Sequence, residues 1–240
     1  MFKKAMGKLK SVTQKNLNRF HARQAIKKGM FKGIDRKAML DLREKFSDHA
    51  FRKYEHKFDH SLVRNAERVF ALGLDKTPPL SILDLGCGFG YFLYGARFFG
   101  HRVVGLDVND PYMLAITQLF GLTKVLHTIR AFQPLPDIPG GPFDRITAFA
   151  TMFDNAGLDG QWGRKEWTFF LRDLRRFMAP TCVLHIKFNQ YVGPGTKSGI
   201  GCRTVTDDLW KFFLEMGGEF DKRFLRIADA PSQVGKLPVL

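Results

Sequence analysis

The sequence predicts an α/β fold in which a mostly parallel β-sheet is covered by helices on both faces. Short apolar runs alternate with amphipathic segments between residues 80 and 227. A glycine-rich turn follows the first apolar run, and an acidic residue, Asp107, ends the second. Parallel neighbouring strands need a crossover connection, usually a helix, so this alternation is typical of a parallel sheet between helical layers.

The individual elements follow from the spacing of apolar residues and from capping residues. Strands are expected at 80–85, 102–106, 124–129, 143–149, 181–188 and 219–227. Helices are expected at 36–47, 61–73, 90–99, 111–120, 166–177 and 206–216. Asp35 is a suitable N-cap for the first of these helices, and Pro111 suits the first turn of the helix that it begins.

Composition excludes several classes of protein. The chain has 240 residues, of which 45% are hydrophobic and 25% charged, so it can bury a core without disulfides. Its three cysteines are far apart and lack metal-type spacing, which favours a reducing compartment. They are Cys87, Cys182 and Cys202. No apolar run approaches the ~20 residues of a membrane-spanning helix, and no secretory leader is visible. We therefore expect a cytoplasmic protein without a metal site.

The net charge of +15 is concentrated near the N-terminus. Residues 1–40 contain twelve Lys and Arg and a single acid, Asp35, so +11 of the net charge resides there. Three interpretations of this stretch remain open. It could bind RNA phosphates, it could lie on an anionic membrane surface through a basic amphipathic helix, or it could be a solvated tail. The membrane and tail interpretations are slightly favoured, because no RNA-binding motif is visible.

The same patterns suggest three parts of the chain. Residues 1–34 form a basic N-terminal arm, and residues 35–79 form a helical extension that ends at Pro78-Pro79. Residues 80–240 form the main domain, which begins with the first predicted strand.

The chemistry is expected in the segment Leu83-Asp84-Leu85-Gly86-Cys87-Gly88-Phe89-Gly90, between a strand and a helix. Glycines allow a tight turn there and let a ligand approach the backbone closely. Asp107 lies 21 residues after Gly86, at the end of the second strand, where a carboxylate can accept hydrogen bonds from both hydroxyls of a ribose. These residues predict a site for an adenosine-type ligand.

The spacing disfavours a dinucleotide. The dinucleotide motif G-x-G-x-x-G places its third glycine where this chain has Tyr91, and a bulky side chain opposes close packing of helix and strand there. Asp84 brings a carboxylate to the turn, which suits a ligand with a positive amino group better than a pyrophosphate.

The D-x-G-x-G-x-G turn, the following helix and the acid after the second strand resemble class I methyltransferases that use S-adenosyl-L-methionine (SAM). The resemblance covers roughly residues 80–227 and continues in Pro134-Leu135-Pro136 and in Phe143-Asp144-Arg145-Ile146. It implies a Rossmann-like three-layer sandwich with strand order 3-2-1-4-5-(7)-6. Only thirteen residues follow Ile227, and they include two prolines, so the last strand is expected at 233–237 or is missing.

The resemblance also implies how SAM would be held. Asp84, Gly86 and Gly88 would bind the methionine end, and Asp107 the ribose. Ala131 and Phe132 would flank the adenine. The remaining residues expected at the cofactor are Cys87 and Gly90 in the turn, Val108 after the second strand, and Tyr54, which would act as a lid contact.

Methyl transfer to a hydroxyl acceptor benefits from a general base. Asp154, in the loop after the fourth strand, is the first candidate, followed by His185 and Glu166. Each also has a structural interpretation: a loop-capping carboxylate, a hydrogen-bonded core histidine and a favourable charge at a helix N-terminus. Trp162 and Trp167 either wall an acceptor pocket or belong to the core.

The sequence lacks the N-P-P-Y motif of amino-directed methyltransferases. The run W-G-x-x-E-W at 162–167 is similar to bacterial methyltransferases of the surface-polysaccharide type. We therefore expect O-methylation of a glycan or another hydroxylated small molecule. An RNA methyltransferase that uses the basic arm is the alternative, and a non-catalytic SAM-binding accessory protein is a third possibility. Peripheral attachment to a membrane through residues 1–34 is compatible with each of these.

Overall fold

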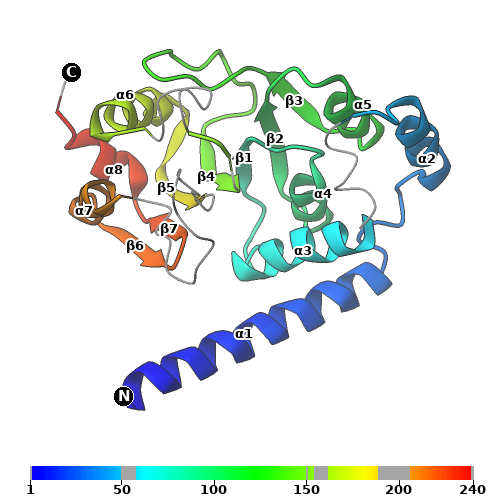
Figure 1. Ribbon diagram of the computed structural model, residues 1–240, viewed down its shortest axis with the longest axis horizontal. Coiled ribbons are helices and arrows are strands. Elements are labelled where there is room, and N and C mark those ends of the chain that lie inside the picture. The colour runs from blue at the N-terminus through cyan, green and yellow to red at the C-terminus, as the bar shows by residue number, and fades with distance from the viewer. Residues whose placement is uncertain (1, 50–57, 150, 154–161, 189–205, 239–240) are drawn as a thin grey trace. The chain divides into compact units, whose positions relative to one another are not determined.

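The computed structural model describes residues 2–49, 58–149, 151–153, 162–188 and 206–238 (Figure 1). The chain divides into two units. The helical unit comprises residues 1–79, 88–101 and 110–123, and the sheet unit comprises residues 80–87, 102–109 and 124–240. Within the described part of the chain, every helix is too short or too polar to cross a lipid bilayer.

A seven-stranded mixed sheet forms the centre of the sheet unit, in the order β3-β2-β1-β4-β5-β7-β6. Its strands are β1 (Ser81–Leu85), β2 (Arg102–Asp107), β3 (Thr123–Leu126), β4 (Phe143–Phe149), β5 (Met178–Lys187), β6 (Gly218–Asp221) and β7 (Phe224–Ile227). β1 pairs in parallel with β2 and β4, β4 pairs in parallel with β5, and β7 runs antiparallel to both β5 and β6. This order confirms the predicted Rossmann-like α/β fold.

Two expectations for the C-terminal part of the sheet differ from the structure. The single strand expected at 219–227 is a hairpin, because the chain reverses at Lys222 and Arg223 between β6 and β7. Lys222 has a φ of +57°, which glycine or asparagine adopts more readily, so the sequence carries no strong turn signal. The last strand is therefore present and short, at 224–227. The strand expected at 233–237 is wrong, since residues Ala230–Gly235 form helix α8, with Pro231 in its first turn.

The main core lies on one face of the sheet, against α6 (Arg164–Leu174), α7 (Asp207–Glu215) and α8. Alternate strand residues supply it, including Leu83, Ile146, Leu184 and Leu225. Trp162 and Trp167 are each 1% exposed and belong to this core, which favours the packing interpretation of both side chains. α6 continues as a 3-10 turn over Arg175–Phe177, so the helix expected at 166–177 is shorter but correctly located.

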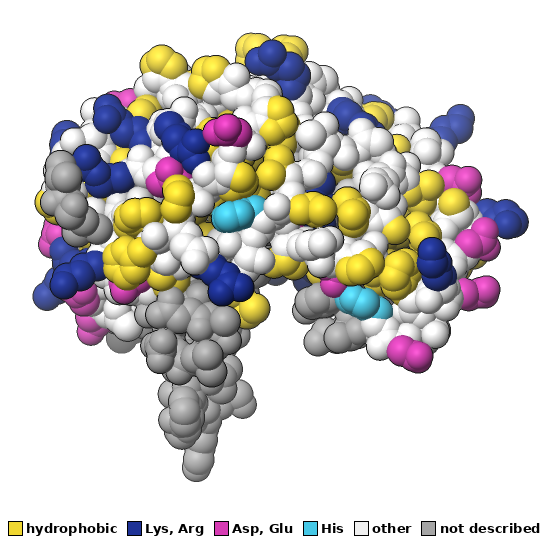
Figure 2. Space-filling view, turned by 90° about the horizontal axis from the view of Figure 1, so that it is seen from above, with side chains coloured by type: hydrophobic (Ala, Val, Ile, Leu, Met, Phe, Trp, Pro, Cys, Tyr) yellow, Lys and Arg dark blue, Asp and Glu magenta, His cyan; other side chains and the backbone are white. Residues whose placement is uncertain are grey.

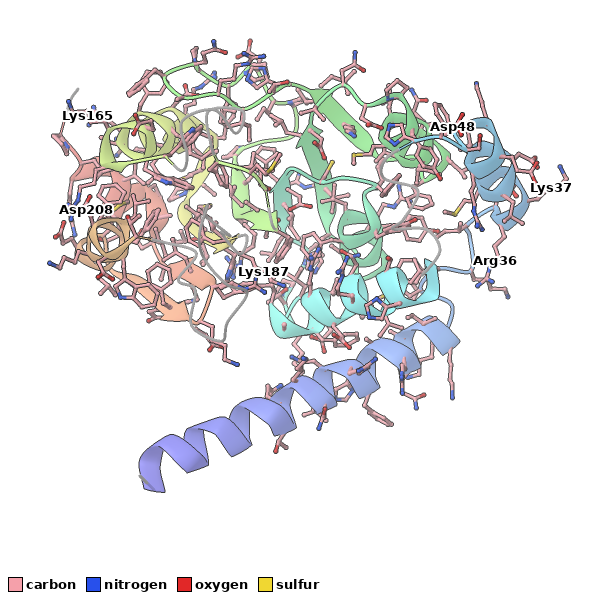
Figure 3. All side chains as sticks on the ribbon, viewed as in Figure 1. Arg36, Lys37, Asp48, Lys165, Lys187 and Asp208 are labelled. Carbon is pink, nitrogen blue, oxygen red and sulfur yellow. The ribbon has the colours of Figure 1, made fainter. Side chains whose placement is uncertain are left out.

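The helical unit contains α1 (Phe2–Lys27), α2 (Arg36–Lys45), α3 (Phe58–Ala71), α4 (Tyr91–Phe98) and α5 (Pro111–Leu119). The Asp35 side chain accepts a 2.9 Å hydrogen bond from the backbone N–H of Ala38, so the predicted N-cap of α2 is confirmed. Early in α2 lies Lys37, which is labelled in Figure 3. Its Nζ is 3.0 Å from Oδ2 of Asp41, one turn along the helix. α5 begins at Pro111, as expected.

Candidate cofactor site

Asp84 lies near the carboxyl end of β1 and is only 3% exposed. In the sheet register its neighbours are Gly105 on β2 and Thr147 on β4. The Thr147 hydroxyl donates a 2.6 Å hydrogen bond to Oδ1 of Asp84, while Gly105 contributes no side chain beside the carboxylate. A buried carboxylate is stable only when donors satisfy it, so this bond orients Asp84 at the edge where ligands bind in parallel sheets.

The turn after β1 returns directly to the end of β2. The backbone N–H groups of Gly86 and Cys87 both donate to the carbonyl oxygen of Leu106, at 2.7 and 3.2 Å. Gly86 has a φ of +72°, and a Cβ at this position would lie 2.4 Å from the Thr151 hydroxyl. That hydroxyl in turn donates a 2.6 Å bond to the carbonyl oxygen of Leu85. The turn therefore requires glycine at position 86 for conformational and steric reasons.

The other two glycines of the turn differ in their surroundings. Gly88 and Gly90 have φ values of +58° and +76°. A Cβ on Gly90 would lie 2.6 Å from Cδ1 of Leu122, whereas a Cβ on Gly88 would meet no atom within 4 Å. Packing thus explains the glycine at 90. At 88 the backbone is open, as expected where a ligand approaches it closely.

Cys87 is buried beside these charges. Burial, followed by the negative charges of Asp107 and Asp84, raises the pKa of the Cys87 thiol well above its ordinary value. The thiol is therefore protonated at neutral pH. Because only a thiolate is a strong nucleophile, Cys87 acts here as a small neutral side chain rather than as a reactive group.

Asp107 is the last residue of β2 and is half-buried. Its Oδ1 accepts a 2.8 Å hydrogen bond from the backbone N–H of Val108, and its carbonyl oxygen accepts one of the same length from His127. The side chain of Val108 is 39% exposed. A carboxylate and an exposed apolar side chain are therefore adjacent at the carboxyl end of β2, which suits a ribose and the base attached to it.

Phe132, in the loop after β3, has a strained backbone. Its φ is +56°, a region that bulky residues rarely adopt, and its ring is 49% exposed. The ring contacts Phe169 of α6 edge to face, with 5.8 Å between centroids. The preceding residue, Ala131, is partly buried against the core. Strain combined with an exposed aromatic ring is a common feature of ligand sites.

The structure gives a different result for each of the three candidate general bases. Asp154 lies outside the described residues, as does the proposed lid residue Tyr54. His185 is 7% exposed, and burial together with the charges of Arg145 and Arg226 lowers its pKa to about 4. Such a histidine is neutral and weakly basic at pH 7, which supports its structural interpretation.

Glu166 has a structural partner at the start of α6. Its Oε2 accepts a 2.9 Å hydrogen bond from the backbone N–H of Gly163, the residue that precedes the helix. This is the contact by which an acidic side chain in the first turn satisfies a donor at a helix N-terminus. The geometry therefore favours the helix-capping interpretation of Glu166.

The sequence analysis did not assign a role in the site to three residues that contact a predicted site residue or the turn itself. They are Thr147, Thr151 and Phe169. Thr147 and Asp84 are separated by 63 residues, and their pairing depends on the register of β1 and β4. A threonine in a strand has no local signal that distinguishes such a role from an ordinary sheet residue.

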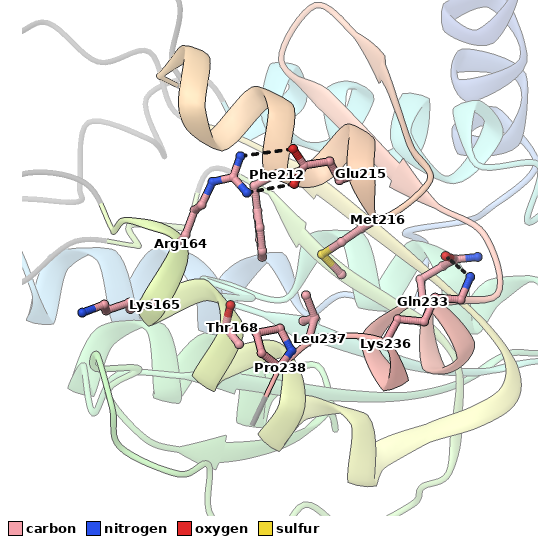
Figure 4. A pocket seen from close by; sticks show the side chains of 10 residues that line it. All are labelled: Arg164, Lys165, Thr168, Phe212, Glu215, Met216, Gln233, Lys236, Leu237 and Pro238. Atoms are coloured by element: carbon pink, nitrogen blue, oxygen red, sulfur yellow. Dashed lines mark hydrogen bonds and ion pairs between the residues drawn. The ribbon is translucent and has the colours of Figure 1, made fainter. Parts of the chain in front are cut away.

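A separate cavity of about 380 Å³ lies among α6, α7 and α8 (Figure 4). Arg164 spans one side of it, with Nη1 at 2.8 Å from Glu215 and Nε at 2.8 Å from Asp208. Its lining residues are Arg164, Lys165, Thr168, Phe212, Glu215, Met216, Gln233, Lys236, Leu237 and Pro238. None of these was predicted to bind the cofactor or to take part in catalysis, so the candidate site is distinct from this cavity.

No family model matches the sequence, and no curated protein matches it significantly. The structure is similar to solved methyltransferases. CcbJ methyltransferase from Streptomyces caelestis has 20% identity and a TM-score of 0.39, over 51% of this chain and 47% of that protein. SAM-bound CalS10, an amino pentose methyltransferase from Micromonospora echinaspora, has 24% identity and a TM-score of 0.41, over 59% and 58%.

A third similar structure is 1,6-didemethyltoxoflavin-N1-methyltransferase from Burkholderia thailandensis with bound S-adenosylhomocysteine. It has 20% identity and a TM-score of 0.40, over 60% of each chain. The present chain spans between 47% and 60% of the length of these three proteins. At such identities the similarity concerns the fold alone.

Proposed function

We propose that this chain is an enzyme that binds SAM and transfers its methyl group to a hydroxyl of a glycan or another small molecule. The observation that carries the proposal is the pair of carboxylates in the sheet unit. Asp84 is buried and held by Thr147 at the end of β1, and Asp107 ends the neighbouring strand β2. The glycine turn that follows Asp84 lets a ligand approach its backbone.

Each residue has a distinct task in this proposal. The ionised Asp84 attracts the α-amino group of the methionine moiety, and Asp107 accepts hydrogen bonds from the ribose hydroxyls. Phe132 offers an exposed ring to the adenine face. SAM supplies an activated methyl group on a sulfonium, so the protein mainly orients donor and acceptor for an in-line displacement.

Direct binding tests the cofactor assignment. Calorimetry on the full chain should show heat with SAM and with S-adenosylhomocysteine, and little with NAD. Asp107→Ala should weaken SAM binding by about tenfold or more, because two hydrogen bonds to the ribose are lost. Asp221→Ala is the matched control, since it removes an exposed carboxylate at the end of β6. Absence of heat with SAM and its demethylated product would contradict the proposal.

The acceptor requires a separate experiment. Cell extract labelled with tritiated methyl groups from SAM, and fractionated into RNA, lipid-linked glycan, protein and small molecules, should carry label in the glycan or small-molecule fraction. Asp154 remains the proposed general base. Asp154→Asn should slow turnover on the labelled acceptor far more than Glu166→Gln does. Near-full turnover of Asp154→Asn would exclude Asp154 as the base.

RNA methylation is the second candidate, and the charge of residues 1–40 is the observation that favours it. On the face shown in Figure 2, Lys and Arg side chains are scattered among hydrophobic ones rather than gathered into one basic groove. Filter binding across a salt series distinguishes the candidates, because binding through phosphate contacts falls steeply as salt rises. Label confined to the RNA fraction would favour this second function.

A further inference from the structure

α1 has one face that is buried in the helical unit and another face that is exposed. The helix packs against α3 of the same unit (Figure 1). Ala22 and Ala25 of α1 are buried. His21 stacks on Phe70 of α3, which adds to this contact. Leu17 and Phe20 lie three residues apart and so share a different face, where they are 46% and 56% exposed. A large aliphatic and a large aromatic side chain are therefore presented together outside the core of the helical unit.

Toward the N-terminus, the sequence contains further apolar residues at helical spacing. Phe2, Met6 and Leu9 precede Leu17 and Phe20 at intervals of three and four residues, or sums of these, which is the spacing of one helical face. The charge carried by this part of the chain has a single sign. Residues 1–34 contain ten Lys and Arg and no Asp or Glu.

An apolar stripe within a wholly basic helix fits one kind of partner. A bilayer with anionic headgroups attracts the Lys and Arg side chains and buries the apolar ones at the headgroup boundary. RNA would satisfy the charges but would leave an aliphatic side chain such as Leu17 in water. α1 is also too polar to cross the bilayer, so it would lie along the surface.

We propose that α1 docks on an anionic lipid bilayer, with Leu17 and Phe20 inserted among the headgroups and the Lys and Arg side chains that flank them near the lipid phosphates. This attachment does not depend on methyltransferase activity. It would hold the protein at a membrane surface as a peripheral protein.

Vesicle sedimentation with the full chain tests the proposal. The protein should bind phosphatidylcholine vesicles that contain phosphatidylglycerol, and bind pure phosphatidylcholine weakly. Leu17→Ser with Phe20→Ser should weaken binding by about tenfold or more, because two inserted apolar side chains are lost. The matched control is Leu40→Ser with Leu214→Ser, which removes two comparably exposed leucines from α2 and α7. This control should bind within about twofold of the unchanged chain.

The contribution of charge is measured in the same way. Replacing Arg23, Lys27 and Lys28 by Gln should also weaken binding by about tenfold or more, since each basic residue adds attraction to the surface. The control replaces Lys37, Lys165 and Lys211, which are also exposed but lie outside α1. Equal loss in both triple variants would show that net charge alone drives binding and would overturn the role assigned to α1.

A second measurement does not rely on loss of binding. Phe20→Trp should show a blue-shifted fluorescence difference spectrum when phosphatidylglycerol vesicles are added, because the indole enters an apolar environment. Absence of this shift, or unchanged binding by the Leu17→Ser and Phe20→Ser variant, would overturn the proposal. Salt-sensitive binding to RNA without binding to vesicles would overturn it in favour of a nucleic-acid partner.

Discussion

The Thr147 hydroxyl donates a 2.6 Å hydrogen bond to the carboxylate of Asp84 across the two central strands β4 and β1. Both side chains are buried, at 0% and 3% exposure. In such surroundings a hydrogen bond to an ionised group is stronger than one between neutral groups. In the proposed function, Thr147 is therefore a positioning residue, which acts on the ligand through Asp84.

Thr147→Val should lower both stability and ligand affinity. Valine has a similar shape but cannot donate, so the free energy of unfolding should fall by about 1–3 kcal/mol. Affinity for SAM should fall as well, because Asp84 is no longer oriented. Thr147→Ser keeps the hydroxyl and should retain most of the affinity. Urea unfolding and calorimetry measure the two effects, and equal affinities of the Val and Ser variants would contradict the positioning role.

Gly88 and Gly90 provide a matched pair within one turn. Both have positive φ, so Gly→Ala at either position introduces backbone strain of about 1–2 kcal/mol. Only Gly90→Ala adds a clash, with Leu122 at 2.6 Å, so it should be the less stable variant by at least about 1 kcal/mol.

Gly88→Ala should also lose more SAM affinity than its small loss of stability would suggest. Gly88→Ala should fold but bind SAM poorly, because its methyl group projects into the open space beside the turn. Thermal unfolding and calorimetry on both variants provide the comparison. If Gly88→Ala binds SAM as well as the unchanged chain, the ligand does not approach this backbone.

Local sequence signals predicted strands and helices where turn or capping residues mark the ends of the element. β4 begins and ends as expected, and α2 begins after its predicted N-cap, Asp35. The hairpin of β6 and β7 was not predictable, because Lys222 and Arg223 form its turn without glycine or asparagine. Residues 219–227 were therefore expected to form one strand, and the structure divides them into two.

The candidate site shows the same difference between local sequence signals, which could be recognised, and tertiary contacts, which could not. Asp84, Gly86 and Asp107 were recognisable as candidates because their chemistry is tied to short spacing in the chain. The partner of Asp84 was not, since strand register is decided by the packing of whole strands. The strain at Phe132 is likewise invisible to a pattern of residue types, because an aromatic residue normally predicts an extended backbone.

His185 should make stability depend on pH. Burial, then Arg145 and Arg226, lower its folded-state pKa to about 4, from an ordinary value of 6.5. Between these values the unfolded chain binds a proton that the folded chain does not. Stability is therefore complete above about pH 6.5 and decreases as the pH falls toward 4, by on the order of 3 kcal/mol in total.

A histidine variant isolates this contribution from that of the carboxylates. His185→Gln should reduce the decrease in unfolding free energy between pH 6.5 and 4, as measured by urea unfolding at several pH values. His60→Gln is the control, because it removes an exposed imidazole from α3. If both variants retain the full pH dependence, His185 is not the group responsible.

Phe132 should respond to substitution in an order opposite to that of ordinary residues. Phe132→Ala keeps a side chain at a φ of +56° and retains the backbone strain, whereas Phe132→Gly relieves it. The glycine variant should therefore be more stable than the alanine variant by about 1 kcal/mol. At Leu126, a comparably exposed apolar residue in β3, alanine should instead be the more stable replacement.

Both Phe132 variants should bind SAM more weakly than the unchanged chain, because the exposed ring is lost from the proposed adenine site. Urea unfolding ranks the four variants, and calorimetry measures the loss of affinity. Strain and recognition are then separable, since glycine restores stability without restoring binding. A more stable alanine variant at position 132 would show that the left-handed backbone is not maintained in solution, and unchanged SAM affinity would remove Phe132 from the cofactor site.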